Sequence, residues 1–227
     1  MRQHVNPLSR FFQVPLELPE PEELFENPLL PVHLDIGSAR GKFLLSMASF
    51  QPDWNYLGLE IRRPLVTSAE RDREKLDLKN LKFMFCNVNV SLEPWLENLR
   101  SKCLKRVSIQ FPDPWFKRRH NKRRVLQPEL LISIANSLHM GSEFFIQSDI
   151  FEVIEPMTSL IQVSGCFNRL EDQNGIWLEK SPFSVLTERE SYVLANRLPV
   201  YRALYVRNAK PIPDLSKLEF EYRELEK

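Results

Sequence analysis

The sequence predicts an α/β protein built on a doubly wound, mostly parallel sheet. From residue 32 onward, short apolar runs of strand length alternate with segments whose apolar residues recur at helical spacing. The connections between these segments are short, and two glycines follow the first apolar run. Repeated strand–helix units of this kind are typical of a parallel sheet with helices on both faces.

Seven apolar runs are expected to form the sheet. The first five, which we expect to be parallel, are Val32–Ile36, Asn55–Glu60, Leu81–Cys86, Val107–Phe111 and Glu143–Asp149. Two later runs, Phe167–Leu170 and Val200–Val206, are expected to form a final strand pair with an antiparallel C-terminal strand.

The segments between these runs carry apolar residues at the spacing of amphipathic helices. The predicted helices cover residues 41–50, 65–76, 92–99 and 128–138, a segment ending near residue 163, and residues 187–196. We expect residues 32–208 to form one folded domain.

Residues 1–31 are predicted to form an extended arm rather than a folded unit. Six prolines between Pro7 and Pro31 favour extended chain broken by turns. The apolar side chains expected to pack this arm against the domain are Leu8, Phe11, Phe12, Leu24 and Phe25.

At the C-terminal end, residues 209–227 form a charged tail. Its apolar residues favour either an amphipathic helix or a subunit contact: Leu215, Leu218, Phe220 and Leu225.

The positive charge of the chain is concentrated in one place. Six of the eight side chains from Lys117 to Arg124 are Lys or Arg, although the formal net charge is only +1, so the rest of the chain sums to −5. This concentration indicates a partner that carries many negative charges and binds at this one place.

The three cysteines have no metal-type spacing and cannot all pair, which favours a cytoplasmic protein. No membrane span, signal peptide or metal site is expected, and monomer and homodimer both stay open.

Asp113 lies between Pro112 and Pro114, directly after the fourth predicted strand. Two prolines stop the strand and prevent a helix, so the carboxylate is held on a stiff loop. Ligands bind at this end of the strands in open α/β sheets. The basic segment Lys117–Arg124 follows at once and favours phosphate binding, although a merely solvated charged face is the common alternative.

The turn after the first strand contains Gly37 and Gly41 in a G-x-x-x-G pattern. A dinucleotide site needs a third glycine, so the turn suits a ligand without a pyrophosphate, such as S-adenosylmethionine, or it is an ordinary turn. Glu60 ends the second strand, where a carboxylate accepts hydrogen bonds from ribose hydroxyls. Asn87 follows the third strand and either contacts an adenine edge or forms a turn.

These motifs together resemble the tRNA (guanine-N7-)-methyltransferase family, which is Rossmann-like and uses S-adenosylmethionine to methylate the variable-loop guanine of tRNA. The matching stretches are Asp35–Gly41, Glu60, Phe111–Trp115, Lys117, Arg119–Arg124, Asp149, Thr187–Glu190 and, in the arm, Asn6–Ser9. Apart from the arm, the resemblance covers roughly residues 30–208. The family often has a further glycine where Ala39 or Arg40 stands and an aspartate where Asn87 stands.

The resemblance implies three groups of site residues. Around the methyl donor it implies Asp35, Gly37, Ser38, Gly41, Glu60, Asn87 and Asp113, with Asp113 also catalytic. Around the target guanosine it implies Lys117, Asp149, Thr187, Glu188, Arg189 and Glu190. Along the tRNA backbone it implies Arg119, His120, Asn121, Lys122, Arg123 and Arg124. Some of these residues have structural alternatives: Thr187 and Glu190 also form a capping-box pattern, and Asp149 also suits a helix N-cap.

This reaction does not need a general base, because guanine N7 has a free lone pair at neutral pH. We therefore expect Asp113 and a second acid to orient the guanine rather than remove a proton. Trp115 is expected either to stack on an extruded base or to close the core. A nucleotide-cofactor oxidoreductase and a non-catalytic RNA-binding protein are the two alternative functions.

Overall fold

The computed structural model describes residues 5–99, 103–171 and 175–225. Its centre is a seven-stranded sheet in the order β3-β2-β1-β4-β5-β7-β6. The strands are β1 Val32–Ile36, β2 Asn55–Glu60, β3 Leu81–Phe85, β4 Leu104–Gln110, β5 Glu143–Ser148, β6 Phe167–Leu170 and β7 Tyr201–Arg207. The β1, β2, β3, β4 and β5 strands run parallel, and β7 lies antiparallel between β5 and β6. This confirms the predicted doubly wound sheet with an antiparallel C-terminal strand.

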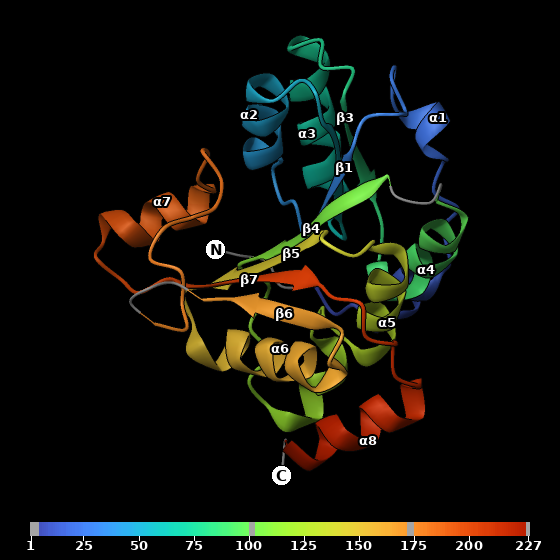
Figure 1. Ribbon diagram of the computed structural model, residues 1–227. Helices are drawn as coiled ribbons and strands as arrows, with labels where there is room; N and C mark the ends of the chain where they lie inside the picture. The colour runs from blue at the N-terminus through green and yellow to red at the C-terminus, as the bar shows by residue number, and fades with distance from the viewer. Residues whose placement is uncertain (1–4, 100–102, 172–174, 226–227) are drawn as a thin grey trace.

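Helices cover both faces of this sheet (Figure 1). The helices on the first face are α4 Val88–Asn98, α5 Pro128–Ser137 and α6 Phe151–Ser164. The helices on the second face are α2 Lys42–Phe50, α3 Arg63–Lys75 and α7 Glu188–Ala195. The larger apolar core lies on the first face, and a smaller core with Phe43, Phe83 and Phe183 lies on the second. No helix within the described ranges combines the length and apolar character needed to cross a bilayer.

Several element boundaries differ from the prediction by one or two residues, and the starts of β4 and α4 differ by more. Strand β4 begins at Leu104, because the charge of Arg106 is paired with Glu143 on the neighbouring strand. Helix α4 begins at Val88, where the Asn87 side chain accepts a hydrogen bond from the Asn89 amide and caps the first turn.

The arm and the tail both pack on the domain. In the arm, Leu24 and Phe25 join the larger core together with Leu18, whereas Leu8 and Phe11 are exposed. Residues 1–4 lie outside the described ranges. The arm also holds the 3-10 helix η1 Arg10–Gln13 and the short helix α1 Pro21–Leu24.

The tail forms helix α8 Leu215–Leu225, which packs on α5 and α6 with Leu218 fully buried. The amphipathic helix is thus observed. Leu215 and Phe220 are exposed, and the side chain of Leu225 lies outside the described part.

Candidate active site

A cavity of about 770 Å³ opens where β1, β2 and β4 end. The carboxyl ends of parallel strands meet at one edge of a sheet, so residues distant in sequence line a common space there. Its wall combines the glycine turn, the loop after β4, the arm and the start of α7: Asp35, Gly37, Ser38, Asp113, Phe12, Thr187, Glu188 and Arg189. A smaller cavity of about 110 Å³ shares Gly37, Gln110 and Asp113 with it and also includes Glu60, Asn87, Trp115 and Arg123.

The glycine turn has a backbone that favours glycine. Gly37 has a φ of +84° and Gly41 a φ of +71°, both in the left-handed region. A Cβ at Gly41 would lie 2.4 Å from Cζ of Phe83, so the turn packs too tightly there for a side chain. Gly37 lines both cavities, whereas Gly41 lines neither and serves the turn itself.

Asp35 lies buried at the floor of the larger cavity. Its Oδ1 accepts hydrogen bonds from Ser108 Oγ at 2.6 Å and Gln110 Nε2 at 3.1 Å. Burial raises the pKa of Asp35 from its ordinary 3.8 to about 6, although the two hydrogen bonds act in the opposite direction. The carboxylate is therefore held in a fixed position by donors from β4.

Glu60 fixes the glycine turn from β2. One carboxylate oxygen accepts from the Ala39 amide at 2.9 Å, and the other accepts from Arg62 Nε at 2.8 Å. The Arg62 side chain pairs with this buried carboxylate at the wall of both cavities. The hydrogen bond that Arg62 donates to Glu60 raises the pKa of Arg62, and the charge of Asp113 acts in the same direction. Ribose binding by Glu60 stays a prediction.

Asn87 ties the arm to the site. Its Nδ2 donates to the carbonyl oxygens of Pro7 at 3.2 Å and Phe12 at 2.9 Å, while its Oδ1 caps α4. The side chain lines the smaller cavity, so the adenine contact stays a prediction. Because Val5, Phe11 and Phe12 line the larger cavity, the arm is part of the site wall.

Asp113 lies on the loop that follows β4 and lines both cavities. Phe111 begins this loop with a φ of +49° and a buried ring, so the chain turns sharply before Pro112. The Asp113 side chain is half-buried and belongs to neither apolar core. The acid and the glycine turn therefore face the same space.

The basic segment Lys117–Arg124 contains the 3-10 helix η2 Arg118–Arg123 beside the smaller cavity. The Arg123 guanidinium lies 5.0 Å from the Trp115 ring centre, and both residues line that cavity. His120 packs edge-on against the same ring, while Lys117, Arg119 and Lys122 are exposed and line neither cavity. Gln127 donates to the backbone oxygens of Asn121 and Arg124 and closes the segment. Trp115 thus lies at the cavity wall rather than in a core cluster.

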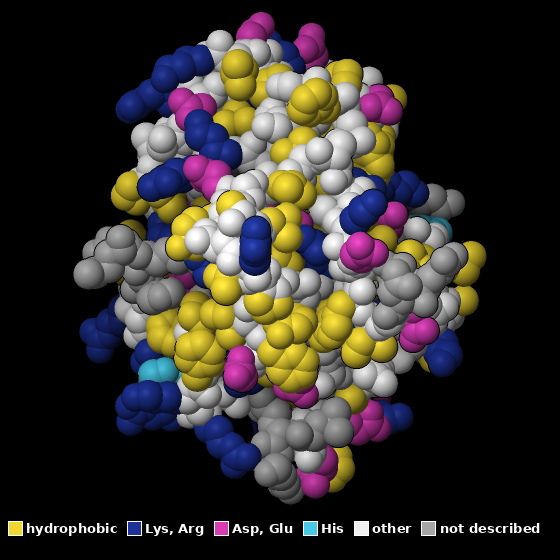
Figure 2. All heavy atoms as spheres, turned by 90° about the vertical axis from the view of Figure 1, so that its left-hand side faces the viewer, with side chains coloured by type: hydrophobic (Ala, Val, Ile, Leu, Met, Phe, Trp, Pro, Cys, Tyr) yellow, Lys and Arg dark blue, Asp and Glu magenta, His cyan; other side chains and the backbone are white. Residues whose placement is uncertain are grey.

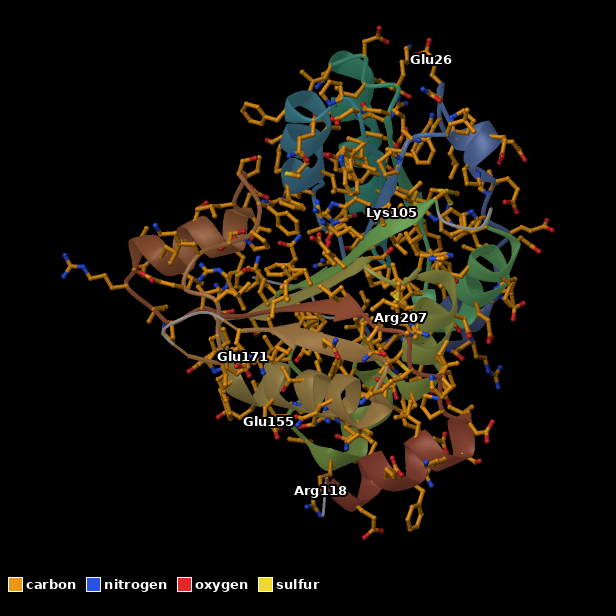
Figure 3. The ribbon with its side chains drawn as sticks, in the orientation of Figure 1. Glu26, Lys105, Arg118, Glu155, Glu171 and Arg207 are labelled. Carbon is orange, nitrogen blue, oxygen red and sulfur yellow. The ribbon has the colours of Figure 1, made fainter. Side chains whose placement is uncertain are left out.

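Arg118 lies at the lower end of the molecule and points away from the body, far from Glu26 at the top (Figure 3). On the side that carries α7, apolar side chains gather below the centre, with Lys and Arg side chains at their lower left edge (Figure 2). Phe116 and Phe151 are among the exposed apolar residues of the molecule. Positive charge and apolar surface therefore meet on this side.

The start of α7 forms the opposite wall. Thr187 Oγ1 accepts from the Glu190 amide at 3.0 Å, which is one half of the predicted capping box. Glu190 instead turns inward, has no exposed area, and accepts from Arg202 Nε at 2.9 Å. Asp149 pairs with Arg189, and Ile150 rather than Asp149 is the N-cap residue of α6. Asp149 and Glu190 therefore lie behind the cavity wall.

Known proteins resemble this chain along its whole length. A family model described as "Putative methyltransferase" matches residues 30–203. The tRNA (guanine-N(7)-)-methyltransferase of Prochlorococcus marinus (strain MIT 9313) is 60% identical over 226 residues, covering 100% of this chain and 96% of that protein. The protein of that name from Parasynechococcus marenigrum (strain WH8102) is 58% identical with the same coverage. The chain belongs to the tRNA (guanine-N(7)-)-methyltransferase family.

Solved structures agree with this methyltransferase family at the level of the fold. A precorrin-6y C5,15-methyltransferase from Geobacter metallireducens superposes with a TM-score of 0.53 at 10% identity, covering 83% of this chain and 86% of that chain. The 16S rRNA methyltransferase KamB gives 0.52 at 16% identity, covering 83% and 91%. The fold is thus the Rossmann-like methyltransferase fold.

The family departures have visible structural consequences. Ala39, one of the two positions at which the resemblance implies a further glycine in the family, has a φ of +51°, which is strained for a residue with a Cβ. Its amide still reaches Glu60, so the turn keeps its shape.

Sequence reasoning missed several wall residues of this methyltransferase. Gln110 lines both cavities and shares the sheet face of Ser108, an alternation visible in the sequence of β4. No sequence pattern indicates that three further residues line the cavity, because their positions depend on long-range packing: Arg62 and the arm residues Val5 and Phe12. Within the described ranges, no three His, Cys, Asp or Glu side chains are grouped to hold a metal ion.

Proposed function

We propose that this chain transfers a methyl group from S-adenosylmethionine to N7 of a guanine in tRNA, with the variable-loop guanine as the target. The observation that carries the proposal is a single cavity onto which the glycine turn, Asp113 and the start of α7 all open. The full-length relatives are named for this activity. These relatives give no support to an oxidoreductase or a non-catalytic RNA-binding protein.

The cavity wall has features that suit the methyl donor. Ser38 Oγ is buried beside the glycine turn and has no hydrogen-bond partner among the described residues, so it is available to a ligand. Asp35, Gly37 and Ser38 would hold one part of the donor, and Glu60 and Asn87 at the adjoining smaller cavity the other. When bound, S-adenosylmethionine supplies an electrophilic methyl group on a sulfonium.

The residues of this chain then have to orient the guanine. The N7 lone pair is free at neutral pH, so no proton has to be removed before attack. Asp113, which lines both cavities, would accept hydrogen bonds from the guanine N1–H and exocyclic amine, which would distinguish guanine from adenine and stabilise the cationic product ring. Glu188 also lines the cavity and is the best-placed second acid, because Asp149 and Glu190 already pair with Arg189 and Arg202.

The tRNA would bind through the basic segment Lys117–Arg124. Its exposed cations suit phosphate groups, and Arg123 and Trp115 carry this surface to the cavity wall. A guanine inside folded tRNA has to be extruded to enter the cavity. A cytoplasmic location belongs to the same proposal and is supported by three cysteines that are all free.

Replacing Asp113 tests the proposal directly. Asp113→Asn should lower methyl transfer to tRNA by roughly 100-fold, the usual effect of removing one group that stabilises a charged transition state. The measurement is transfer of labelled methyl from S-adenosylmethionine, followed by mapping of the modified base. Asp77→Asn, an exposed acid just after α3, is the matched control and should leave the rate unchanged.

Near-normal transfer by Asp113→Asn would remove this residue from the mechanism. Wild-type protein that labels a base other than guanine, or labels no tRNA at all, would contradict the proposed function itself.

A further inference from the structure

A row of hydrogen-bonded side chains crosses the sheet beneath the larger cavity. Its members come from four adjacent strands and from α7, and we call it the polar row: Asp35, Ser108, Gln110, Gln147, Glu190 and Arg202. The strands β1, β4, β5 and β7 that carry it lie next to one another in the sheet (Figure 1). All six residues are buried.

Two glutamine amides form the middle of the polar row. Gln147 Nε2 donates to Gln110 Oε1 at 2.8 Å and to Glu190 Oε2 at 3.2 Å. Gln110 Nε2 donates in turn to Asp35 Oδ1 at 3.1 Å. The backbone register places Gln110 directly beside Gln147 on neighbouring strands.

The donors and acceptors of the row allow one orientation of both amides. Arg202 can only donate, and the Glu190 carboxylate accepts from it, so Gln147 turns its NH₂ group toward Glu190. The same NH₂ group also meets Gln110 Oε1, which leaves the Gln110 NH₂ group to face Asp35. The charge pair at one end of the row therefore determines how the amide at the other end holds the cavity acid.

One end of the polar row lines the larger cavity, and the other end lies behind the helix that forms its opposite wall. Asp35 and Gln110 line the cavity on the side of the glycine turn. Glu190 holds the first turn of α7, whose Thr187, Glu188 and Arg189 line the other side. Gln147 has no exposed area and lines neither cavity, so it can act only through its neighbours.

A purely structural purpose explains the row poorly. Gln147 Oε1 is buried without a hydrogen-bond partner among the described residues, which costs free energy that an apolar side chain would not. Buried polar groups are often no more stabilising than apolar side chains of the same volume. A row with this cost is better explained by what it connects.

We propose that Gln110 and Gln147 are positioning residues that couple the methyl-donor side of the cavity to its guanosine side, so that each ligand tightens the binding of the other. The inference rests on the proposed function for the identity of the two ligands. A donor in the cavity contacts Asp35, and the row transmits the effect of this contact through the two amides to Glu190 and the start of α7. Coupling of this kind is reciprocal by thermodynamic necessity.

The test measures binding and does not require turnover. The affinity of the full chain for S-adenosylhomocysteine is measured by calorimetry without tRNA and with saturating tRNA. Wild-type protein should bind it at least about fivefold more tightly with tRNA present, the lower end of coupling between two sites. In Gln147→Met, which keeps the length but removes the amide, this ratio should fall to about one.

Two further variants separate coupling from a loss of stability. Asn80→Ala also removes an amide that donates two hydrogen bonds, to the carbonyls of Ala48 and Trp54, but it lies outside both cavities. It should lower the melting temperature and leave the ratio at the wild-type value. Gln110→Met, at the cavity wall, should repeat the effect of Gln147→Met, and the double variant should be no worse than either single variant.

A wild-type ratio of one would overturn the inference, as would a Gln147→Met or Gln110→Met protein that loses thermal stability but keeps the wild-type ratio. Failure of the proposed function has a different signature, because the wild-type protein would then methylate no tRNA guanine.

Discussion

At the scale of single residues, burial decides the protonation of Asp35. The carboxyl lies beneath the cavity, where loss of water raises its pKa to about 6 and the negative charge of Glu60 acts in the same direction. Hydrogen bonds from Ser108 and Gln110 oppose this rise only in part. The folded protein therefore keeps the Asp35 proton at pH values at which the unfolded chain has already lost it.

This difference predicts a pH-dependent effect of Asp35→Asn on stability. A raised pKa means that the folded state binds more protons between about pH 4 and 6, so Asp35 makes the unfolding free energy fall as the pH rises through that window. By pH 7 the ionised carboxylate costs about 3 kcal/mol.

Asp35→Asn removes this contribution, so its unfolding free energy relative to wild type should increase from pH 4 to pH 7. Urea denaturation at several pH values measures the difference. The hydrogen bond from Ser108 is kept in this variant, because the Ser108 hydroxyl can still donate to the side-chain oxygen of the asparagine. A difference that stays constant across the range would contradict the burial of this acid.

At the scale of elements, the N-terminal arm completes a site that the sheet and helices leave open. Asn87 holds it through two donated hydrogen bonds, and the ring of Phe11 lies 6.0 Å from that of Phe85 on β3. Ser91 on α4 adds a third contact by accepting from the Leu16 amide at 3.0 Å. The arm is therefore anchored by the first turn of α4, although its own sequence has little regular structure.

Asn87→Asp should release the arm without unfolding α4. The carboxylate still accepts from the Asn89 amide, but it has no donor for the Pro7 and Phe12 oxygens. Each of these two hydrogen bonds contributes about 1 kcal/mol, so cleavage by trypsin after Arg10 should become roughly ten- to thirtyfold faster.

Limited proteolysis followed by mass spectrometry measures this cleavage. The control is Asn80→Asp, which also removes two donated hydrogen bonds but lies beside the far end of the arm, near Asn27, and should not change the rate at Arg10. Equal cleavage rates in wild type and Asn87→Asp would show that other contacts hold the arm.

At the scale of the whole molecule, charge is distributed unevenly. The chain is nearly neutral, with a formal net charge of +1, yet exposed cations follow one another in Lys117–Arg124. Counterions released from phosphates by such a segment make binding depend on salt. The protein should therefore bind tRNA through one surface.

The double variant Arg119→Ala/Lys122→Ala removes two exposed cations from that surface. Its tRNA binding should depend less on salt than that of the wild type. The slope of log affinity against log salt should fall by about one for each phosphate that the variant no longer neutralises. Binding to unmodified tRNA is measured at several salt concentrations. Lys217→Ala, an exposed lysine on α8, is the control and should keep the wild-type slope. A reduced slope in the control alone would place the RNA on α8 instead of the basic segment.

Local patterns predicted most of the sheet and its helices, because apolar periodicity reports which side of a segment is buried. They also predicted Thr187 as a cap, since a cap depends on residues three positions away. The start of β4 escaped prediction because the charges of Lys105 and Arg106 contradict the pattern of a strand. Arg106 is accommodated by Glu143 and by the ring of Trp54, 4.7 Å from its guanidinium, and both come from distant parts of the chain.

The sequence by itself determined the fold class, the glycine turn and the proline-flanked acid with its basic segment, because each depends on neighbouring residues. Only the tertiary structure decided that the arm closes the cavity, that Glu190 turns inward to Arg202, and that Gln110 and Gln147 connect the two sides. These arrangements join residues tens of positions apart, and such contacts exist only after the strands have been ordered in the sheet.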